Sequence, residues 1–486
     1  MTHTVIIGGG IAGLSAAWYS LKKASETRVT LLEAGDCWGG KISTERIPFE
    51  GGQFVVEGGP DTFLATKPYA TALCKELGID ARLHGTNPQQ KSTYVLHRGR
   101  LLPLPDGLAM MIPTNIASIL GSGLLNWPAK LRMGLDFVLP ARSLNGDESL
   151  GAFVSRRLGR AAYENLIEPL MSGIYAGDGD ALSLQSTFPY LRDLELKYGS
   201  LARGALAMRK KSASNGKAAH GSRSTFLTPT TGLAEIVEVL VAHLQNADLR
   251  LNSPAVRITD QVDKYQVELG DGSVLEADSV ILATPAYVSA ALLESLDPHL
   301  AADLAAIPYA STATVSLAYR QADLPRALDG YGYVIPRREG RRALACTWTS
   351  TKFPHRAPEG CALIRVFVGR AGDPPDIPPF SYRKTLAFAS VNLDENGGTE
   401  GGLLSLAREE LALTLGISAE PILSRVFVWP NAMPQYNLGH PQRLVNIDAA
   451  LEKHPGLALA GNGYKGIGIP DCIHSGELAA EKTVKK

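Results

Sequence analysis

The feature that most constrains the fold of this chain is a glycine-rich turn between an apolar strand and a helix near the N-terminus. Residues 5–7 form a short apolar run, GGGIAG follows at 8–13, and residues 11–23 have the alanine-rich composition and spacing of a helix. In a G-x-G-x-x-G turn the glycines allow a tight turn, close backbone approach to a pyrophosphate, and close helix–strand packing. The helix N-terminus adds unpaired N–H groups for the phosphates. The pattern predicts a dinucleotide-binding β-α-β unit.

The second strand of this unit carries an acidic residue at its end. Residues 28–33 (RVTLLE) form the expected strand and end on Glu33. An acid at this place accepts hydrogen bonds from ribose hydroxyls and disfavours a 2′-phosphate. NAD and FAD share this motif, so the choice between them stays open at this point.

Length, charge and cysteine content narrow the class of protein. A chain of 486 residues is too long for one hydrophobic core, so two or three domains are expected. Lys+Arg and Asp+Glu both number 48, so no overall field attracts nucleic acid, and we expect no such partner. Five scattered cysteines predict neither a disulfide framework nor a metal site. Because neither a signal peptide nor an apolar run of spanning length is visible, we expect a cytoplasmic protein.

Composition along the chain suggests how the domains are divided. Residues 209–224 are basic and polar, which predicts a flexible surface loop. Residues 104–140 predict short helices whose apolar face either packs in a helix layer or meets a membrane surface or the substrate. The expected division is a discontinuous dinucleotide-binding domain (1–80, 225–290 and 425–486), a substrate-binding sheet domain (81–100 and 291–424) and a helical insertion (101–224). Further strands are expected at 255–270, 280–285, 311–320, 361–369, 424–429 and 457–460, with helices at about 400–415 and from about 471.

A second glycine pair follows Glu33 in the sequence EAGDCWGGK at 33–41. Gly39 and Gly40 let the chain pass close to a cofactor, and Lys41 can neutralise a phosphate. This E-A-x4-G-G-[KR] arrangement resembles the glutathione-reductase-like flavoprotein superfamily, particularly its amine-oxidase-like branch. The resemblance implies FAD as the cofactor.

The C-terminal sequence AGNGYKGIGIPD at 460–471 also fits this resemblance. Flavoproteins of this kind end with a strand, a glycine loop and a helix whose N-terminus faces the isoalloxazine and stabilises negative charge on the reduced flavin. His474 then falls in the first turn of that helix, and we expect no catalytic role for it. The residues implied to contact FAD are Gly8, Gly10, Ile11, Ala12, Gly13, Glu33, Ala34, Gly40, Lys41, Gly58, Gly59, Pro60, Val256, Gly461, Asn462, Ile467, Gly468 and Ile469.

Five segments from end to end of the chain resemble the porphyrinogen oxidases of haem biosynthesis, which act on protoporphyrinogen or coproporphyrinogen III. They are VEGGPDTFL (56–64), LPLPDGL (102–108), PLMSGIYAGD (169–178), WPNAMPQY (429–436) and GIGIPDC (466–472). The resemblance implies an α/β fold: a Rossmann-like FAD-binding domain of the glutathione-reductase/amine-oxidase type, a mixed-sheet substrate domain and the helical insertion.

The resemblance also implies the reaction, a six-electron oxidation of a porphyrinogen in three two-electron steps, with molecular oxygen reoxidising the flavin. Hydride leaves for the flavin and the pyrrole N–H can lose its proton to water, so we nominate no catalytic acid or base. The ending GIGIPDC resembles the bacterial type that uses coproporphyrinogen III, and protoporphyrinogen IX is the alternative substrate. Contact with ferrochelatase or with the membrane surface is implied as well, whereas the oligomeric state is not.

Substrate-binding residues follow from the same resemblance. Gly173 would lie against the macrocycle, with its carbonyl facing the pyrrole nitrogens. Plant-type members carry a propionate-binding arginine just before the strand that here reads YVL at 94–96, where this chain has KST at 91–93. Lys91 and Lys67 are therefore the candidates for the carboxylates.

Other functions on the same fold stay open. Amine oxidases usually carry a glutamate directly after the final Ala-Gly pair, where this chain has Asn462. An amine oxidase or a carotenoid-type desaturase is one alternative, and an FAD-stabilised protein without enzymatic activity is another.

Overall fold

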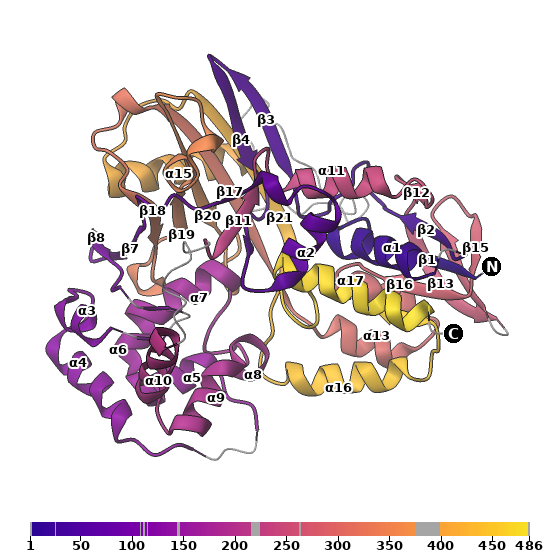
Figure 1. Ribbon diagram of the computed structural model, residues 1–486, viewed down its shortest axis with the longest axis horizontal. Helices are drawn as coiled ribbons and strands as arrows, with labels where there is room; N and C mark the ends of the chain where they lie inside the picture. The colour runs from indigo at the N-terminus through magenta and orange to yellow at the C-terminus, as the bar shows by residue number, and fades with distance from the viewer. Residues whose placement is uncertain are drawn as a thin grey trace.

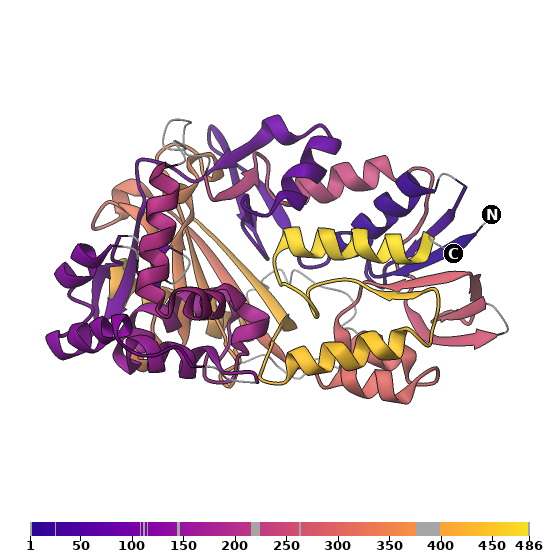
Figure 2. The same cartoon turned by 60° about the horizontal axis from the view of Figure 1, so that its bottom comes forward.

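The computed structural model describes residues 2–24, 26–106, 108–109, 112–113, 115–142, 146–214, 224–261, 264–375 and 399–484. Two sheets organise these residues, a five-stranded parallel sheet near both chain termini and a seven-stranded mixed sheet (Figure 1). A group of helices packs beside the larger sheet, at the end of the molecule opposite the termini (Figure 2). Within the described residues, none of the helices combines the length and the apolar character needed to cross a bilayer.

The five-stranded sheet contains the predicted β-α-β unit. Its strands in spatial order are β12 (Asp248–Arg250), β2 (Arg28–Leu32), β1 (His3–Ile7), β16 (Ser279–Leu282) and β22 (Leu457–Leu459). All neighbours are parallel. In β1, Ile6 faces one core while Val5 and Ile7 face the other. Burial on both faces explains why this strand is continuously apolar.

Helices cover one face of this sheet, and a mixed layer covers the other. The first layer contains α1 (Ile11–Lys23), α2 (Pro68–Glu76), α11 (Ala234–His243) and α17 (Ile469–Val484). The second contains β13 (Ala255–Gln261), β14 (Lys264–Leu269), β15 (Val274–Ala277), α12 (Ala286–Leu293), α13 (Pro298–Ala305) and α16 (His440–Leu451). Two smaller elements connect the lobe of the five-stranded sheet to the lobe of the seven-stranded sheet. One is the hairpin of β3 (Thr44–Phe49) and β4 (Gly52–Glu57), and the other is a three-stranded sheet of β5 (Phe63–Leu64), β11 (Phe226–Pro229) and β6 (Leu83–Gly85).

The seven-stranded sheet is antiparallel except for one parallel pair, β18 with β7. In spatial order its strands are β21 (Leu423–Pro434), β17 (Tyr309–Arg320), β20 (Cys361–Val368), β19 (Ala343–Trp348), β18 (Gly330–Val334), β7 (Ser92–His97) and β8 (Arg100–Pro103). The helix α15 (Thr399–Leu415) packs on one face through Leu403, Ala407 and Leu411.

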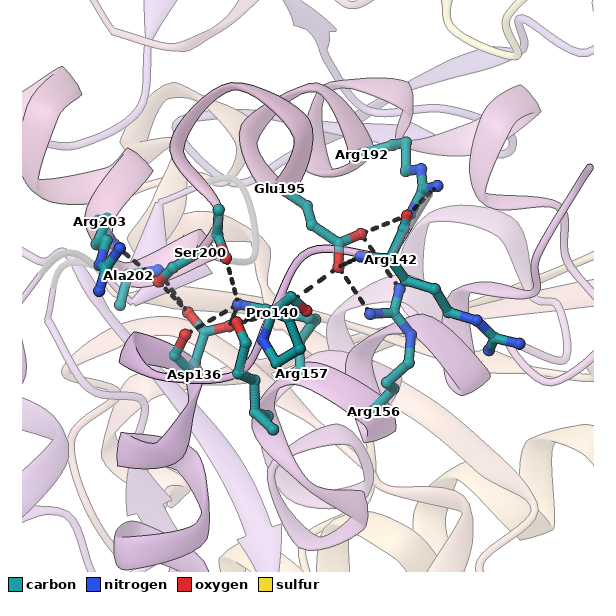
Figure 3. A network of polar contacts seen from close by, with 12 residues as sticks. Asp136, Pro140, Arg142, Arg156, Arg157, Arg192, Glu195, Ser200, Ala202 and Arg203 are labelled. Carbon is teal, nitrogen blue, oxygen red and sulfur yellow. Dashed lines mark hydrogen bonds and ion pairs between the residues drawn. The ribbon is translucent and has the colours of Figure 1, made fainter. Parts of the chain in front are cut away.

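The helical insertion has its own core and a buried ion network. Its main helices are α3 (Ile116–Gly121), α4 (Trp127–Gly134), α5 (Leu150–Leu158), α7 (Glu168–Tyr175), α8 (Leu184–Thr187), α9 (Pro189–Tyr198) and α10 (Leu201–Ser214), with a π-helical turn at Tyr163–Ile167. Asp136 and Arg157 are both fully buried, and their side chains pair in the network shown in Figure 3. The apolar residues in and after α4 differ in burial. Met133 is buried, but Trp127, Leu131 and Val138 are 64–73% exposed.

Most elements expected from the sequence are present, and four expectations differ. Short helices were expected from residue 104, but residues 108–109 and 112–113 pair as the antiparallel strands β9 (Leu108–Ala109) and β10 (Ile112–Pro113), and α3 begins only at Ile116. Prolines at 103, 105 and 113 disfavour a helix there. Residues 209–214 continue α10 although the basic loop was expected to begin at 209, and residues 215–223, like Gly107, lie outside the described residues. Strand β21 lies in the seven-stranded sheet rather than with the dinucleotide domain, because it pairs with β17 along nearly its whole length. Helix α13 was expected in the sheet domain but packs under the five-stranded sheet through Leu300 and Leu304.

Candidate functional site

The G-x-G-x-x-G turn has the geometry that its glycines predict. Gly8 has a φ of +109°, and a Cβ on it would lie 2.7 Å from the carbonyl oxygen of Ala283. A Cβ on Gly13 would lie 1.9 Å from the carbonyl oxygen of Gly8, so only glycine allows α1 this close to β1. A Cβ on Gly10, by contrast, would meet nothing within 4 Å. Gly10 therefore leaves open space beside the N-terminus of α1. The next two residues, Ile11 and Ala12, are buried.

The second glycine pair lies directly against this turn. The Gly39 N–H donates to the Gly9 carbonyl over 2.9 Å. Gly40 has a φ of +58°, and a Cβ on it would lie 3.2 Å from the Gly10 Cα. The two glycine-rich segments, separate in sequence, thus form one backbone cradle that ends at Lys41.

Glu33 is held by the backbone of the same cradle. Its side chain is buried, and its two carboxylate oxygens accept N–H bonds from Gly9 (2.7 Å) and Gly35 (2.8 Å). Burial raises the pKa of Glu33, and the two N–H bonds oppose that rise. The sequence predicted a ribose ligand here; the structure shows that Glu33 also fixes the glycine turn. Each carboxylate oxygen keeps a second lone pair for a ribose hydroxyl.

Other predicted cofactor residues lie beside this end of β2. Ala34 follows Glu33 in the chain, and the Ser253 N–H donates to the Glu33 carbonyl over 2.9 Å. Val256 lies three residues further, in β13, with 48% of its surface exposed.

Lys41 is a partly buried lysine without a carboxylate partner among the described residues. Its Nζ lies 3.5 Å from the Asn462 side-chain oxygen and 5.9 Å from the centre of the Tyr309 ring. Burial lowers the pKa of Lys41 to about 8. A partly buried cation without a carboxylate partner fits an anionic group such as a pyrophosphate.

The segment after β4 reaches the same place. A Cβ on Gly59 would lie 1.8 Å from the Lys41 carbonyl oxygen, and a Cβ on Gly58 would lie 2.6 Å from the Phe427 ring. Gly58, Gly59 and Pro60 therefore run between Lys41 and the seven-stranded sheet.

The C-terminal glycine loop is held by two side chains for which no role was expected from the sequence. The Tyr436 hydroxyl donates to the Asn462 carbonyl (2.6 Å) and accepts from the Gly466 N–H (3.0 Å). His440 donates from Nε2 to the Tyr464 carbonyl over 3.0 Å and stacks on Tyr436. Because Tyr436 ends the AMPQY motif and His440 follows it four residues later, that motif was the signal that could have revealed them. Gly461, with a φ of +116°, leaves open space above the loop.

The start of α17 carries the remaining predicted cofactor residues, Ile467, Gly468 and Ile469. The Gly468 N–H donates to the Asp471 carboxylate over 3.3 Å, and Lys67 pairs with both oxygens of that carboxylate at 2.7 Å. Lys67, a predicted propionate ligand, is thus already engaged. His474 stacks on Tyr69, with 3.9 Å between the ring centres, in the helical position expected for it.

The segments around PLMSGIYAGD (169–178) and WPNAMPQY (429–436) contact each other. Gln435 donates from its side-chain nitrogen to the Tyr175 carbonyl (2.9 Å), and the Ser183 N–H donates to the Tyr436 carbonyl (2.8 Å). These bonds join the α7 region to Gln435 and Tyr436, and Tyr436 in turn binds the C-terminal glycine loop at Asn462. Gly173 is an exposed position of α7, where a Cβ would meet nothing within 4 Å. Lys91 is exposed just before β7, with no hydrogen bond or ion pair to these segments among the described residues.

Comparison with known proteins agrees with this geometry. A family model described as flavin containing amine oxidoreductase matches residues 11–483. The chain is 38% identical to coproporphyrinogen III oxidase of Bacillus subtilis, covering 98% of this chain and 97% of the relative. It is 30% identical to human protoporphyrinogen oxidase, covering 98% and 97%. A solved structure of a candidate protoporphyrinogen oxidase from Exiguobacterium sp. 255-15 superimposes with a TM-score of 0.83 at 32% identity, covering 99% and 98%.

These matches extend over nearly the whole chain. The fold expected from the sequence, a dinucleotide-binding lobe with a sheet domain and a helical insertion, is confirmed. The chain therefore belongs to the flavin containing amine oxidoreductase family, and the Bacillus subtilis and human relatives to which it is similar are porphyrinogen oxidases.

Proposed function

We propose that the flavin is FAD and that it lies along the cradle formed by the glycine turns, Lys41 and the C-terminal loop. Gly10 and Gly40 leave the backbone accessible to a pyrophosphate, and Lys41 supplies the charge that matches it. Glu33, directly after β2, would accept hydrogen bonds from the ribose hydroxyls, and the N-terminus of α17 offers N–H groups and a positive dipole end. When bound, FAD supplies a two-electron acceptor; the chain binds and orients it and the substrate.

We propose further that the substrate is coproporphyrinogen III, oxidised to coproporphyrin III with oxygen as the final acceptor. The observation that carries this choice is the difference in identity, 38% to the coproporphyrinogen III oxidase of Bacillus subtilis against 30% to the human protoporphyrinogen oxidase. Oxidation of protoporphyrinogen IX by the same chemistry is the second candidate.

This proposal is tested by comparing the oxidation rates of the two porphyrinogens in air. The rates are measured from the fluorescence of the porphyrin products. We expect a higher kcat/KM with coproporphyrinogen III. Equal rates would remove the preference. Peroxide production from spermine or benzylamine, with neither porphyrinogen oxidised, would instead identify an amine oxidase.

The pH dependence of FAD binding should report on Lys41. A bound pyrophosphate favours the charged amine, so the pKa of Lys41 in the complex should exceed its value of about 8 without FAD. Below pH 8 the affinity should be constant. Above pH 8 binding takes up a proton, and the Kd should rise by up to about tenfold per pH unit until the pKa of the complex is reached.

Fluorescence titration of the deflavinated protein between pH 6.5 and 10 measures this dependence. Lys41→Met should weaken binding at pH 7 and abolish the rise. The matched control is Lys264→Met, at the exposed first residue of β14. The same rise in Lys41→Met would assign the titration to another group.

Gly173→Leu should impair turnover without releasing the flavin. The new side chain meets no protein atoms at its Cβ, so α7 accommodates it, but it projects where we place the macrocycle. We expect kcat/KM for coproporphyrinogen III to fall at least about tenfold, because one misplaced group disrupts the orientation of the reacting atoms. Gly402→Leu, at an exposed position of α15, is the matched control. An unchanged rate in Gly173→Leu would place the substrate elsewhere.

A further inference from the structure

One buried carbonyl near the proposed flavin site accepts three side-chain hydrogen bonds. The Gly58 carbonyl receives the Thr314 hydroxyl (2.9 Å), the Arg365 guanidinium (2.8 Å) and the Trp429 indole N–H (2.9 Å). The donors come from β17, β20 and β21 of the seven-stranded sheet. A carbonyl oxygen has two lone pairs. Here three donors share them, and the three bonds together hold this peptide in one orientation. We call Thr314, Arg365 and Trp429 the Gly58 clamp.

Arg365 is the charged member of the Gly58 clamp, and its charge has no contact ion pair among the described residues. It is 3% exposed, and the same guanidinium nitrogen also donates to the Gly59 carbonyl. Its Nε and Nη1 have no hydrogen-bond partner in the described structure. An arginine stays protonated inside proteins, so a positive charge lies directly behind the Gly58–Gly59 peptide.

The two nearest carboxylates are each matched by another cation. Glu57 pairs with Arg356 at 2.7 Å, and Asp61 pairs with Lys352 at 3.0 Å. Burial alone would raise the pKa of Asp61, but Lys352 and then Arg365 bring it down to about 2. With both pairs neutral, the cluster carries the net positive charge of Arg365. A cavity of about 10 Å³, lined by Arg365 and both carboxylates, adjoins the guanidinium.

The opposite edge of the clamped peptide carries a free donor. The described peptide bonds are trans, so the Gly59 N–H points away from the Gly58 carbonyl and hence away from Arg365. Within the described residues this N–H has no partner, whereas the Gly58 N–H bonds to the Ser43 carbonyl at 2.8 Å. Bonds on the carbonyl polarise the peptide and strengthen its N–H as a donor.

We propose that Arg365 is a positioning residue for the flavin: with the rest of the Gly58 clamp it presents the Gly59 N–H to the cofactor and places a positive charge behind it. This inference rests on the proposed flavin site, in which Gly58–Pro60 contact the cofactor. A fixed donor and a buried positive charge both stabilise the negative charge of reduced flavin. The Gly58 clamp therefore favours the reduced form without touching substrate.

The midpoint potential of the bound flavin, measured by equilibration with reference dyes, tests this role. Arg365→Met keeps the apolar stem but removes the charge and the donors. At a fixed potential we expect the ratio of oxidised to reduced flavin to rise at least about tenfold, which is about 30 mV for a two-electron couple. Thr314→Val removes one donor without a charge and should shift the ratio about threefold. Arg320→Met, at an exposed end of β17, is the control and should shift nothing.

A wild-type potential in flavin-loaded Arg365→Met would overturn the proposal. If that variant does not fold, Thr314→Val and Arg365→Lys decide: the first should lower the potential, and the second, which keeps the charge but loses the fork, should raise the Kd for FAD about tenfold. Wild-type values in both would equally overturn it. Dye equilibration requires no porphyrinogen, so an enzyme that shows the shift but oxidises no porphyrinogen would refute the proposed function alone.

Discussion

Gly13→Ala should yield a protein that purifies without flavin. The added Cβ would lie 1.9 Å from the Gly8 carbonyl oxygen and 3.2 Å from the Ala283 Cβ. The first of these is a backbone atom in the turn itself, so the clash is relieved only if α1 moves away from β1 or the turn opens. Either movement displaces the N–H groups at the N-terminus of α1 from the pyrophosphate. We expect FAD affinity to fall at least about 100-fold, or about 3 kcal/mol.

The ratio of flavin to protein absorbance after purification, followed by FAD titration, measures this loss. Gly402→Ala is the matched control because its Cβ would meet nothing within 4 Å on the exposed side of α15. Alanine is about 1 kcal/mol better than glycine inside a helix, so the control should be at least as stable as the parent. Circular dichroism separates loss of cofactor from loss of fold. A Gly13→Ala protein that retains stoichiometric flavin would show that the turn does not bind the pyrophosphate.

The parts of the site that could be predicted from the sequence are those where the chemistry depends on a few adjacent residues. The turn at 8–13, the pair Gly39–Gly40 and the loop at 460–471 each require glycine for a local backbone reason, and each reason is visible in one short segment. Each was expected to lie beside one cofactor, and the structure adds the direct bond from the Gly39 N–H to the Gly9 carbonyl. The glycine geometry of the candidate site is therefore the part that a short sequence segment can predict.

The Gly58 clamp could not be predicted, because its members lie far apart in the chain. Thr314, Arg365 and Trp429 each occupy one strand, and none of these strands indicates its neighbours in the sheet. Arg365 interrupts an apolar run, CALIRVFV, and an isolated arginine in a strand usually lies at a surface. Only the strand order β21-β17-β20 brings the three donors to one carbonyl. The same long-range pairing moved β21 out of the domain assigned to it.

The buried ion pair of Arg157 and Asp136 in the helical insertion could not be predicted from the sequence either, because its partners also lie far apart in the chain. Arg157 donates to the Asp136 carboxylate at 2.6 Å and to the carbonyls of Leu139, Pro140 and Gly199 at 3.0–3.2 Å (Figure 3). The other Asp136 carboxylate oxygen accepts from the Ser200 hydroxyl at 2.6 Å. One side chain thus joins the end of α4, α5 and the connection between α9 and α10.

Arg157→Met should lower the free energy of unfolding of the insertion by about 3–5 kcal/mol, because it leaves the buried Asp136 carboxylate without a cation and several carbonyls without donors. Denaturant unfolding followed by circular dichroism measures the loss. Arg160→Met, which breaks a half-exposed pair with Asp180, is the control and should cost less than about 1 kcal/mol. Adding Asp136→Asn to Arg157→Met removes the uncompensated charge and should recover part of the stability.

Because α7 belongs to the insertion while the cradle lies in the other lobe, Arg157→Met should also lose porphyrinogen turnover at temperatures where its flavin remains bound. Simultaneous loss of flavin and turnover would show that the two lobes unfold as one unit.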